Sequence, residues 1–353
     1  RHSSETKEDQ KQNHAYQSIR RKILASILLP SCIPLLLVSA VILYQFYASY
    51  AAKVQDHLAA LVQKHTQNID TFLQERLADI QTLSTENMLI DLQNSTRLQQ
   101  ELANLQRVYG NLFVDLGLVD ESGRQVAYAG PYELEGTDYS QATWFQQAKQ
   151  NEITISDVFL GKRGFPHFIV TVRRLQDDRV WVVRSTIDFG AFTSLVQNIR
   201  IGQTGFAFIT NKQGELQTQA SEDLRAEVQQ YLRLTANVDS EVLVTRASFN
   251  DHGRCIVAIA PLKNSQWYFF YQQQTGEVFA GLYKAFILVL GIVLIGFAGI
   301  ASAGFILSSR MIAQIKTVTE EKEVMTLQVV QAGKMAAVGE LAAGIAHEIN
   351  NPV

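Results

Sequence analysis

The chain contains two long stretches without a charged residue. Residues 23–52 carry none over 30 positions, and residues 285–309 carry none over 25. A helix needs about 20 predominantly apolar residues to cross the hydrocarbon core of a bilayer. The pattern therefore predicts transmembrane helices over residues 23–50 and 284–309, and a membrane helix tolerates the two prolines of the first stretch.

Basic residues indicate how these helices are oriented. Three of them, at positions 20–22, precede the first stretch, and Arg310 and Lys316 follow the second. Lysine and arginine are enriched on the cytoplasmic side of membrane proteins. We therefore expect both termini to be cytoplasmic, with a polar tail over residues 1–22, and residues 51–281 to lie outside the membrane.

The segment between the two stretches begins with helical spacing and continues with strand-like patterns. Apolar residues recur every three or four positions from Leu58 to Leu83 and from Leu98 to Val108, which predicts long helices over about residues 51–110. Short runs rich in valine, isoleucine and aromatic residues then alternate with turns, which is typical of strands. The expected strands are 112–119, 125–128, 168–174, 180–187, 205–210, 215–218, 241–247, 255–261 and 267–272, with helices over 139–150 and 222–234.

This order of elements predicts an α+β protein. Two similar α/β units, over about residues 111–200 and 201–275, are expected to follow one another on a long helix. Charged residues make up only 18% of the chain, below the usual share of about 25%, which agrees with part of the chain lying in lipid. The net charge of -3 gives no reason to expect a nucleic-acid partner. Cys32 lies in the first apolar stretch and Cys255 in the outer segment, so no intrachain disulfide is expected.

Apolar residues after the second stretch follow a heptad pattern. They are separated by steps of four and three, with Lys322 interrupting the series, which predicts a parallel coiled coil over residues 310–333 and hence a homodimer. A further helix, the beginning of a dimerisation segment, is expected over residues 334–353. The heptad positions are Met311, Ile315, Val318, Met325, Val329, Ala332 and Ala336.

The last residues place a histidine beside a carboxylate and an amide, an arrangement that suits nucleophilic or acid–base chemistry. His347 is followed by Glu348, and Asn351 lies four positions on, which is the same face of a helix as His347. One imidazole nitrogen can attack a phosphoryl group while a neighbouring carboxylate accepts or orients the proton on the other. A zinc-protease motif would read His-Glu-x-x-His, but asparagine at position 351 removes the second histidine ligand, and no metal site is predicted.

The run GELAAGIAHEINNP, residues 339–352, closely resembles the phospho-acceptor box of bacterial two-component sensor histidine kinases. The resemblance implies that His347 is autophosphorylated, that Glu348 is the general base and that Asn351 supports phosphatase action on a response regulator. It also implies a homodimer in the bacterial inner membrane and a full-length enzyme that uses ATP and Mg²⁺.

The resemblance also implies an ATP-binding domain, which we do not recognise within the 353 residues. Family members carry an ATP-binding domain downstream of the box, and no GxxxxGK[ST] motif occurs elsewhere in the sequence. Phosphoryl transfer needs ATP and Mg²⁺ held in position. We therefore expect the sequence to be truncated just after the box, and this chain alone not to autophosphorylate.

The outer segment resembles a double-Cache sensor domain. The resemblance implies binding of a small extracytoplasmic molecule in the first, membrane-distal unit. Chemoreceptors share such outer domains, so a ligand-binding signalling module without kinase activity is the alternative function. The pieces that carry the resemblance are Tyr139 with Trp144-Phe145, the strand ending at Asp188, the run GQTGFAF at 202–208, and Trp267-Tyr268-Phe269, in this order.

The same resemblance implies a set of ligand-binding residues. In amino-acid-binding members an arginine two residues before the tryptophan clamps the ligand carboxylate, and an aspartate at the end of a later strand holds the amine. Asp188 takes the aspartate position, but Ala142 takes the arginine position, which argues against an ordinary amino-acid ligand. Lys162, Arg163 and His167 are candidate replacements for the missing arginine. The aromatic residues expected to line the pocket are Tyr128, Tyr132, Tyr139 and Trp144, although Trp144 and Phe145 are equally compatible with a place in the core.

Overall fold

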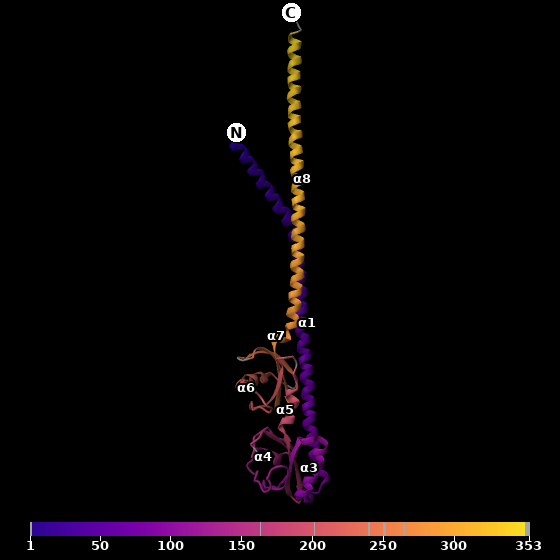
Figure 1. The fold of residues 1–353 in the computed structure, drawn as a ribbon, viewed down its shortest axis with the longest axis vertical. Coiled ribbons are helices and arrows are strands. Elements are labelled where there is room, and N and C mark those ends of the chain that lie inside the picture. The colour runs from indigo at the N-terminus through magenta and orange to yellow at the C-terminus, as the bar shows by residue number, and fades with distance from the viewer. Residues whose placement is uncertain are drawn as a thin grey trace. The chain divides into compact units, whose positions relative to one another are not determined.

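The computed structural model describes residues 2–162, 164–200, 202–238, 241–249, 252–263 and 266–349. The chain divides into two compact units. One comprises Arg1–Ser49 and Leu282–Val353, and the other, Tyr50–Gly281, is called the sensor unit below. Two long helices, α1 (His2–Glu86) and α8 (Ala280–Ile349), form the described part of the first unit and continue into the second (Figure 1).

Both long helices contain a segment that is long and apolar enough to cross a membrane. Pro30 and Pro34 lie inside α1 without ending it. Leu37 is 62% exposed and Ile295 is 74% exposed, and a contiguous apolar surface of this kind is typical of lipid contact. The helices approach one another at Gly304, where an added Cβ would lie 3.7 Å from Cγ2 of Ile27.

Residues 310–349, which follow the second apolar stretch, belong to α8 as a single uninterrupted helix. Val318, Met325 and Val329, three of the predicted coiled-coil positions, are more than half exposed in the single chain. Pairing of these positions with a second copy stays a prediction. His347 and Glu348 fall within α8, whereas Asn351 lies outside the described residues, as does Arg163.

The sensor unit contains a five-stranded antiparallel sheet in the order β2-β1-β5-β4-β3. Helix α4 (Thr143–Gln150) packs on one face, where Trp144 and Phe145 join Ile169 and Val182 in the core. Its strands are β1 (Phe113–Val119), β2 (Gln125–Ala129), β3 (Ile153–Ile155), β4 (His167–Gln176) and β5 (Arg179–Asp188). Helix α3 (Ser95–Tyr109) packs against β1 and β2.

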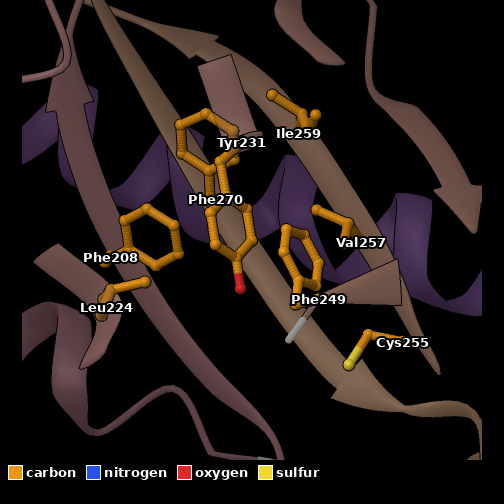
Figure 2. Packing of buried hydrophobic residues seen from close by; sticks show 8 residues of the cluster. All are labelled: Phe208, Leu224, Tyr231, Phe249, Cys255, Val257, Ile259 and Phe270. Carbon is orange, nitrogen blue, oxygen red and sulfur yellow. The ribbon is translucent and has the colours of Figure 1, made fainter. Parts of the chain in front are cut away.

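A four-stranded antiparallel sheet follows in the order β6-β9-β8-β7. Its core combines side chains of the strands with Leu224 and Tyr231 of helix α6 (Glu222–Leu234), as labelled in Figure 2. The Tyr231 ring stacks on Phe249 at 4.1 Å and meets Phe208 edge-on at 5.0 Å, and Phe208 in turn stacks on Phe270 at 4.9 Å. The strands are β6 (Phe206–Asn211), β7 (Leu243–Phe249), β8 (Gly253–Leu262) and β9 (Trp267–Gln274).

Helix α1 contacts the elements of both sheets within the sensor unit (Figure 1). The Phe72 ring lies 6.2 Å from Phe192 of α5 (Phe189–Gln197), the helix that joins the sheets. The backbone amide of Lys263, between β8 and β9, donates to Asp70 at 2.9 Å, and Arg174 of β4 donates to the Ser84 carbonyl. The remaining short elements are α2 (Leu89–Leu92), η1 (Gly110–Leu112), η2 (Thr235–Asn237) and α7 (Thr275–Val278).

Most predicted strands agree with observed ones, and two expectations are wrong. Residues 215–218 form no strand. The Ile209 amide donates to the Thr218 hydroxyl rather than to a backbone carbonyl, and the segment forms only an isolated bridge between Leu216 and Thr210. The helix expected over residues 139–150 begins only at Thr143. Residues 139–142 form a turn in which the Ala142 amide donates to the Tyr139 carbonyl at 2.8 Å.

Candidate functional site

A cavity of about 790 Å³ opens beside α4 in the sensor unit. Its walls are the loop that leads into α4, the first turns of that helix and the segment that follows β3, and strands β4 and β5 form its floor. Glu215, next to the four-stranded sheet, completes the lining. A concave site of this size suits a small molecule.

Aromatic residues form one side of the cavity. The Tyr139 ring meets Trp144 edge-on with centroids 5.1 Å apart, and Phe159 lies 4.5 Å from the His167 ring. Trp144 is 4% exposed and also belongs to the core cluster, so it supports the fold and lines the cavity at once. Gly161 has a φ of 53°, and a Cβ there would come within 2.6 Å of His167, so glycine allows the loop to approach the histidine.

The floor of the cavity is polar at Arg184, in the middle of β5. The side chain is 1% exposed, and its Nη1 lies 3.0 Å from Oδ1 of Asp115, which is fully buried on the neighbouring strand. Arg184 Nε donates to Gln125 Oε1 at 2.7 Å, and Nη1 also donates to the Thr186 hydroxyl at 3.3 Å. A buried charge is tolerated when it is paired and hydrogen-bonded in this way.

A glycine provides the space for this arginine. Gly117 lies opposite Arg184 in the β1–β5 ladder, and an added Cβ would lie 2.6 Å from Gln125 Oε1 and 3.0 Å from Arg184 Nε. The Tyr128 hydroxyl donates to Asp115 Oδ2 at 3.2 Å, and the Tyr128 ring centroid lies 5.9 Å from Arg184 Cζ. These residues form a connected polar group at the floor of the cavity.

The segment after β3 connects the cavity to the four-stranded sheet. Asp157 accepts hydrogen bonds from Trp267 Nε1 at 2.6 Å and from Asn211 Nδ2 at 3.0 Å. Lys263 Nζ lies 3.7 Å from Asp157 and donates to the Ser156 carbonyl at 3.3 Å. Burial lowers the pKa of Lys263 to about 8, although the Asp157 carboxylate opposes this shift. One wall of the cavity is therefore held by side chains of the second sheet.

Charged groups of both signs line the cavity. Lys162 and Arg184 are the described cations, with Lys162 Nζ 5.7 Å from the Tyr139 ring centroid. Asp138 lies among the lining residues, and hydrogen bonds from Ser140 hold the pKa of its carboxyl below the usual range. Arg184 is paired with Asp115, so the lining carries no large excess of positive charge.

The structure separates the predicted ligand-binding residues into groups. Tyr139, Trp144 and His167 line the cavity. Asp188 does not: it caps α5, accepting from the Ala191 amide at 2.7 Å, and with Tyr132 it lines a separate cleft of about 420 Å³ that His167 also borders. Tyr128 does not line the cavity, and its hydroxyl donates to Asp115 instead. Ala142 lines the cavity at the start of α4. A methyl group therefore stands where amino-acid-binding family members have the arginine that clamps the carboxylate, as the sequence predicts.

Sequence reasoning missed Arg184, Asp138, Asp157 and Phe159 as lining residues. A signal for Arg184 was present, since it is a charged residue at the centre of a strand that otherwise reads as buried. The other three stand in loops whose path the sequence pattern did not define.

Comparisons with known proteins identify the fold of the sensor unit. The dCache_1 family, described as a Cache domain, matches residues 46–282. The chain belongs to this family. Cache domains are sensor domains of signal-transducing proteins, and this Cache domain is flanked by two helices that are apolar enough to cross a membrane. No curated protein sequence matches the chain.

Solved Cache domains have the same fold. The ligand-binding domain of the Pseudomonas aeruginosa amino-acid chemoreceptor PctB, in complex with L-Arg, is 17% identical, with a TM-score of 0.53 over 64% of this chain and 97% of that one. The extracellular domain of mmHK1S-Z3, assigned as a histidine kinase, is 13% identical, with a TM-score of 0.52 over 65% and 98%. The sensory domain of the Campylobacter jejuni chemoreceptor Tlp3, with isoleucine bound, is 12% identical, with a TM-score of 0.50 over 65% and 96%.

Proposed function

We propose that the protein is a membrane-bound sensor histidine kinase of a two-component system. Its tandem Cache domain lies outside the bacterial inner membrane, and both termini lie in the cytoplasm. A small molecule binds in the cavity beside α4 and changes the phosphorylation of His347. The observation that carries ligand binding is the cavity itself, with its aromatic side, its polar floor and its opening beside α4.

Binding reaches the rest of the Cache domain through the segment after β3. Asp157 belongs to the cavity lining and to the contact with Trp267 and Lys263 of the second sheet. A ligand that moves this wall changes contacts that lie outside the cavity. A ligand shifts such an equilibrium by its difference in affinity for the two arrangements.

The kinase output rests on the sequence of the phospho-acceptor box. In this proposal His347 accepts the phosphoryl group, Glu348 acts as general base, and Asn351 supports dephosphorylation of the response regulator. The chain acts as a homodimer through the heptad positions of α8, which are exposed in the single chain. ATP and Mg²⁺ are held by a nucleotide-binding domain.

A chemoreceptor is the second candidate function. The PctB sensor domain is as similar in structure as that of mmHK1S-Z3, so the outer fold favours neither class. The run GELAAGIAHEINNP favours the kinase, because a chemoreceptor has no need of a phospho-acceptor histidine.

Phosphorylation tests the kinase proposal. A polypeptide that continues residues 1–353 into a histidine-kinase ATP-binding domain is placed in vesicles and incubated with γ-labelled ATP and Mg²⁺. We expect an acid-labile label that disappears in His347→Gln and remains in the control His57→Gln, which changes a histidine of the sensor unit. Label that persists in His347→Gln would refute His347 as the acceptor, and a wild-type polypeptide that takes no label would refute the kinase assignment and favour the chemoreceptor.

A further inference from the structure

Arg184 has a hydrogen-bond donor that the fold does not use. Its Nε and Nη1 are bonded to Gln125, Asp115 and Thr186, but Nη2 is buried and has no partner among the described residues. A guanidinium carries five N–H donors and no acceptor. A buried donor without a partner costs free energy, so an unpaired nitrogen in such an ordered group requires an explanation.

The geometry of the guanidinium is fixed by its neighbours. Gln125, which accepts from Nε, is itself held because its Nε2 donates to the Leu134 carbonyl at 2.8 Å. Asp115 accepts from Nη1 and also from the Thr186 amide at 3.3 Å. Because three partners hold Nε and Nη1, the remaining nitrogen has a defined direction before any ligand binds, which is the preorganisation that binding sites use.

Arg184 lines the cavity and is more buried than Lys162, the other described cation of the lining. We propose that Arg184 is the anion-binding residue of this Cache domain, with Nη2 donating to the carboxylate of a small organic acid. This inference rests on the proposed ligand binding in the cavity. The body of the acid lies against the aromatic side of the cavity at Trp144 and Phe159.

The charges around the site favour a monoanion. The Asp115 carboxylate, 3.0 Å from Arg184, already neutralises the guanidinium charge. A ligand therefore meets one hydrogen-bond donor, Nη2, rather than a full positive charge. Asp138 and Asp157 also line the cavity and disfavour a second negative charge on the ligand. A doubly charged phosphate or dicarboxylate fits this lining less well than a monocarboxylate.

Access to Nη2 involves the aromatic side of the cavity. The nitrogen has almost no contact with solvent, so a ligand oxygen must displace a neighbouring side chain to reach it. Tyr139 is the candidate, because it lines the cavity and its ring centroid lies 5.4 Å from the Arg184 Cζ. Binding of the carboxylate is thereby linked to a movement of the loop that leads into α4.

Titration with matched compounds tests the inference. The chain in detergent micelles is titrated calorimetrically with short aliphatic and aromatic monocarboxylates, with the primary amide of each and with the corresponding amines. We expect at least one acid to bind and its amide to bind roughly tenfold to a hundredfold more weakly, because a charge-assisted hydrogen bond is lost. Equal binding of acid and amide, or binding of amines alone, would overturn the inference while the proposed ligand binding stands. Failure of every compound to bind would count against both.

Variants identify the residue. Arg184→Lys keeps a positive charge beside Asp115 but lacks the second nitrogen, and the double variant Asp115→Asn/Arg184→Met removes both buried charges together, which protects the fold. In both we expect the acid to lose roughly tenfold to a hundredfold in affinity, and the amide to lose less, because its uncharged oxygen accepts a weaker hydrogen bond from Arg184. The matched control is Arg173→Lys on β4, whose side chain donates to the Lys149 carbonyl at 2.9 Å and does not line the cavity. Wild-type affinity for the acid in both Arg184 variants would refute the assignment.

Discussion

Replacing Asp157 by alanine should weaken the contact between the two sheets. The change leaves Trp267 Nε1 without its 2.6 Å acceptor inside a fully buried side chain, and it removes the carboxylate beside Lys263, which is 9% exposed. An unpaired buried donor costs about 1–3 kcal/mol. Asp157 is itself 45% exposed, so solvent screens the ion pair and its loss adds only about 1 kcal/mol. We expect Asp157→Ala to lower the free energy of unfolding by about 2–4 kcal/mol.

Thermal unfolding of the chain in detergent, followed by tryptophan fluorescence, measures this effect. For a unit of this size the expected loss corresponds to a fall of roughly 5–15 °C in Tm. Asp157→Asn is the matched control, because its amide oxygen still accepts from Trp267, whereas the charge and the hydrogen bond from Asn211 to the second oxygen are lost. It should cost about 1–2 kcal/mol, less than Asp157→Ala.

A double-mutant cycle with Lys263→Met separates the two contributions. If Lys263 is held by the Asp157 carboxylate, the double variant should be more stable than the sum of the single effects predicts, because it leaves no buried ammonium without its carboxylate. Strict additivity, or an Asp157→Ala variant as stable as the wild type, would refute the reasoning.

Two further predictions concern Glu277 and Gly117. Hydrogen bonds from the Thr204 hydroxyl and from the Gln203 and Thr204 amides lower the pKa of Glu277 to about 2. The folded state therefore binds fewer protons than the unfolded state between about pH 4.5 and pH 2, so the stabilisation is complete above this range and is lost as the pH falls through it. The difference in Tm between wild type and Glu277→Gln should shrink over that range in a pH series, and a constant difference would contradict this account. Gly117→Ala places a Cβ 2.6 Å from Gln125 Oε1 and should cost about 1–3 kcal/mol in thermal unfolding, whereas Gly276→Ala, where a Cβ meets nothing within 4 Å, should be tolerated.

The sequence was sufficient to predict elements whose pattern is local. The helix expected over residues 222–234 matches α6, because an apolar stripe follows a capping serine, Ser221, whose hydroxyl accepts from the Leu224 amide. β3 was missed, because a three-residue edge strand has no pattern of its own and exists only through pairing with Val170–Val172. Local signals thus identify an element but not its partner.

The candidate site depends on contacts between residues far apart in the chain. Tyr139 and Trp144 were found through their family resemblance, and both line the cavity. Arg184 was not found, because its place there is set by its pairing with Asp115, 69 positions away, and by the β1–β5 register that sets Gly117 opposite it. A single sequence does not contain that register. Asp157 was missed for the same reason, since Trp267 and Lys263 come from the other sheet.

The first and last residues of the sensor unit contact each other. The Tyr50 hydroxyl donates to the Val278 carbonyl at 3.0 Å, and the Tyr50 and Phe279 rings lie 5.7 Å apart. The chain therefore enters and leaves the unit at neighbouring points. A module with adjacent ends can be inserted between two helices of another protein without stretching either connection. Because its two ends lie together, the Cache domain can be joined to different membrane helices without a change in its own fold. This is a physical reason why one outer fold serves receptors with different outputs.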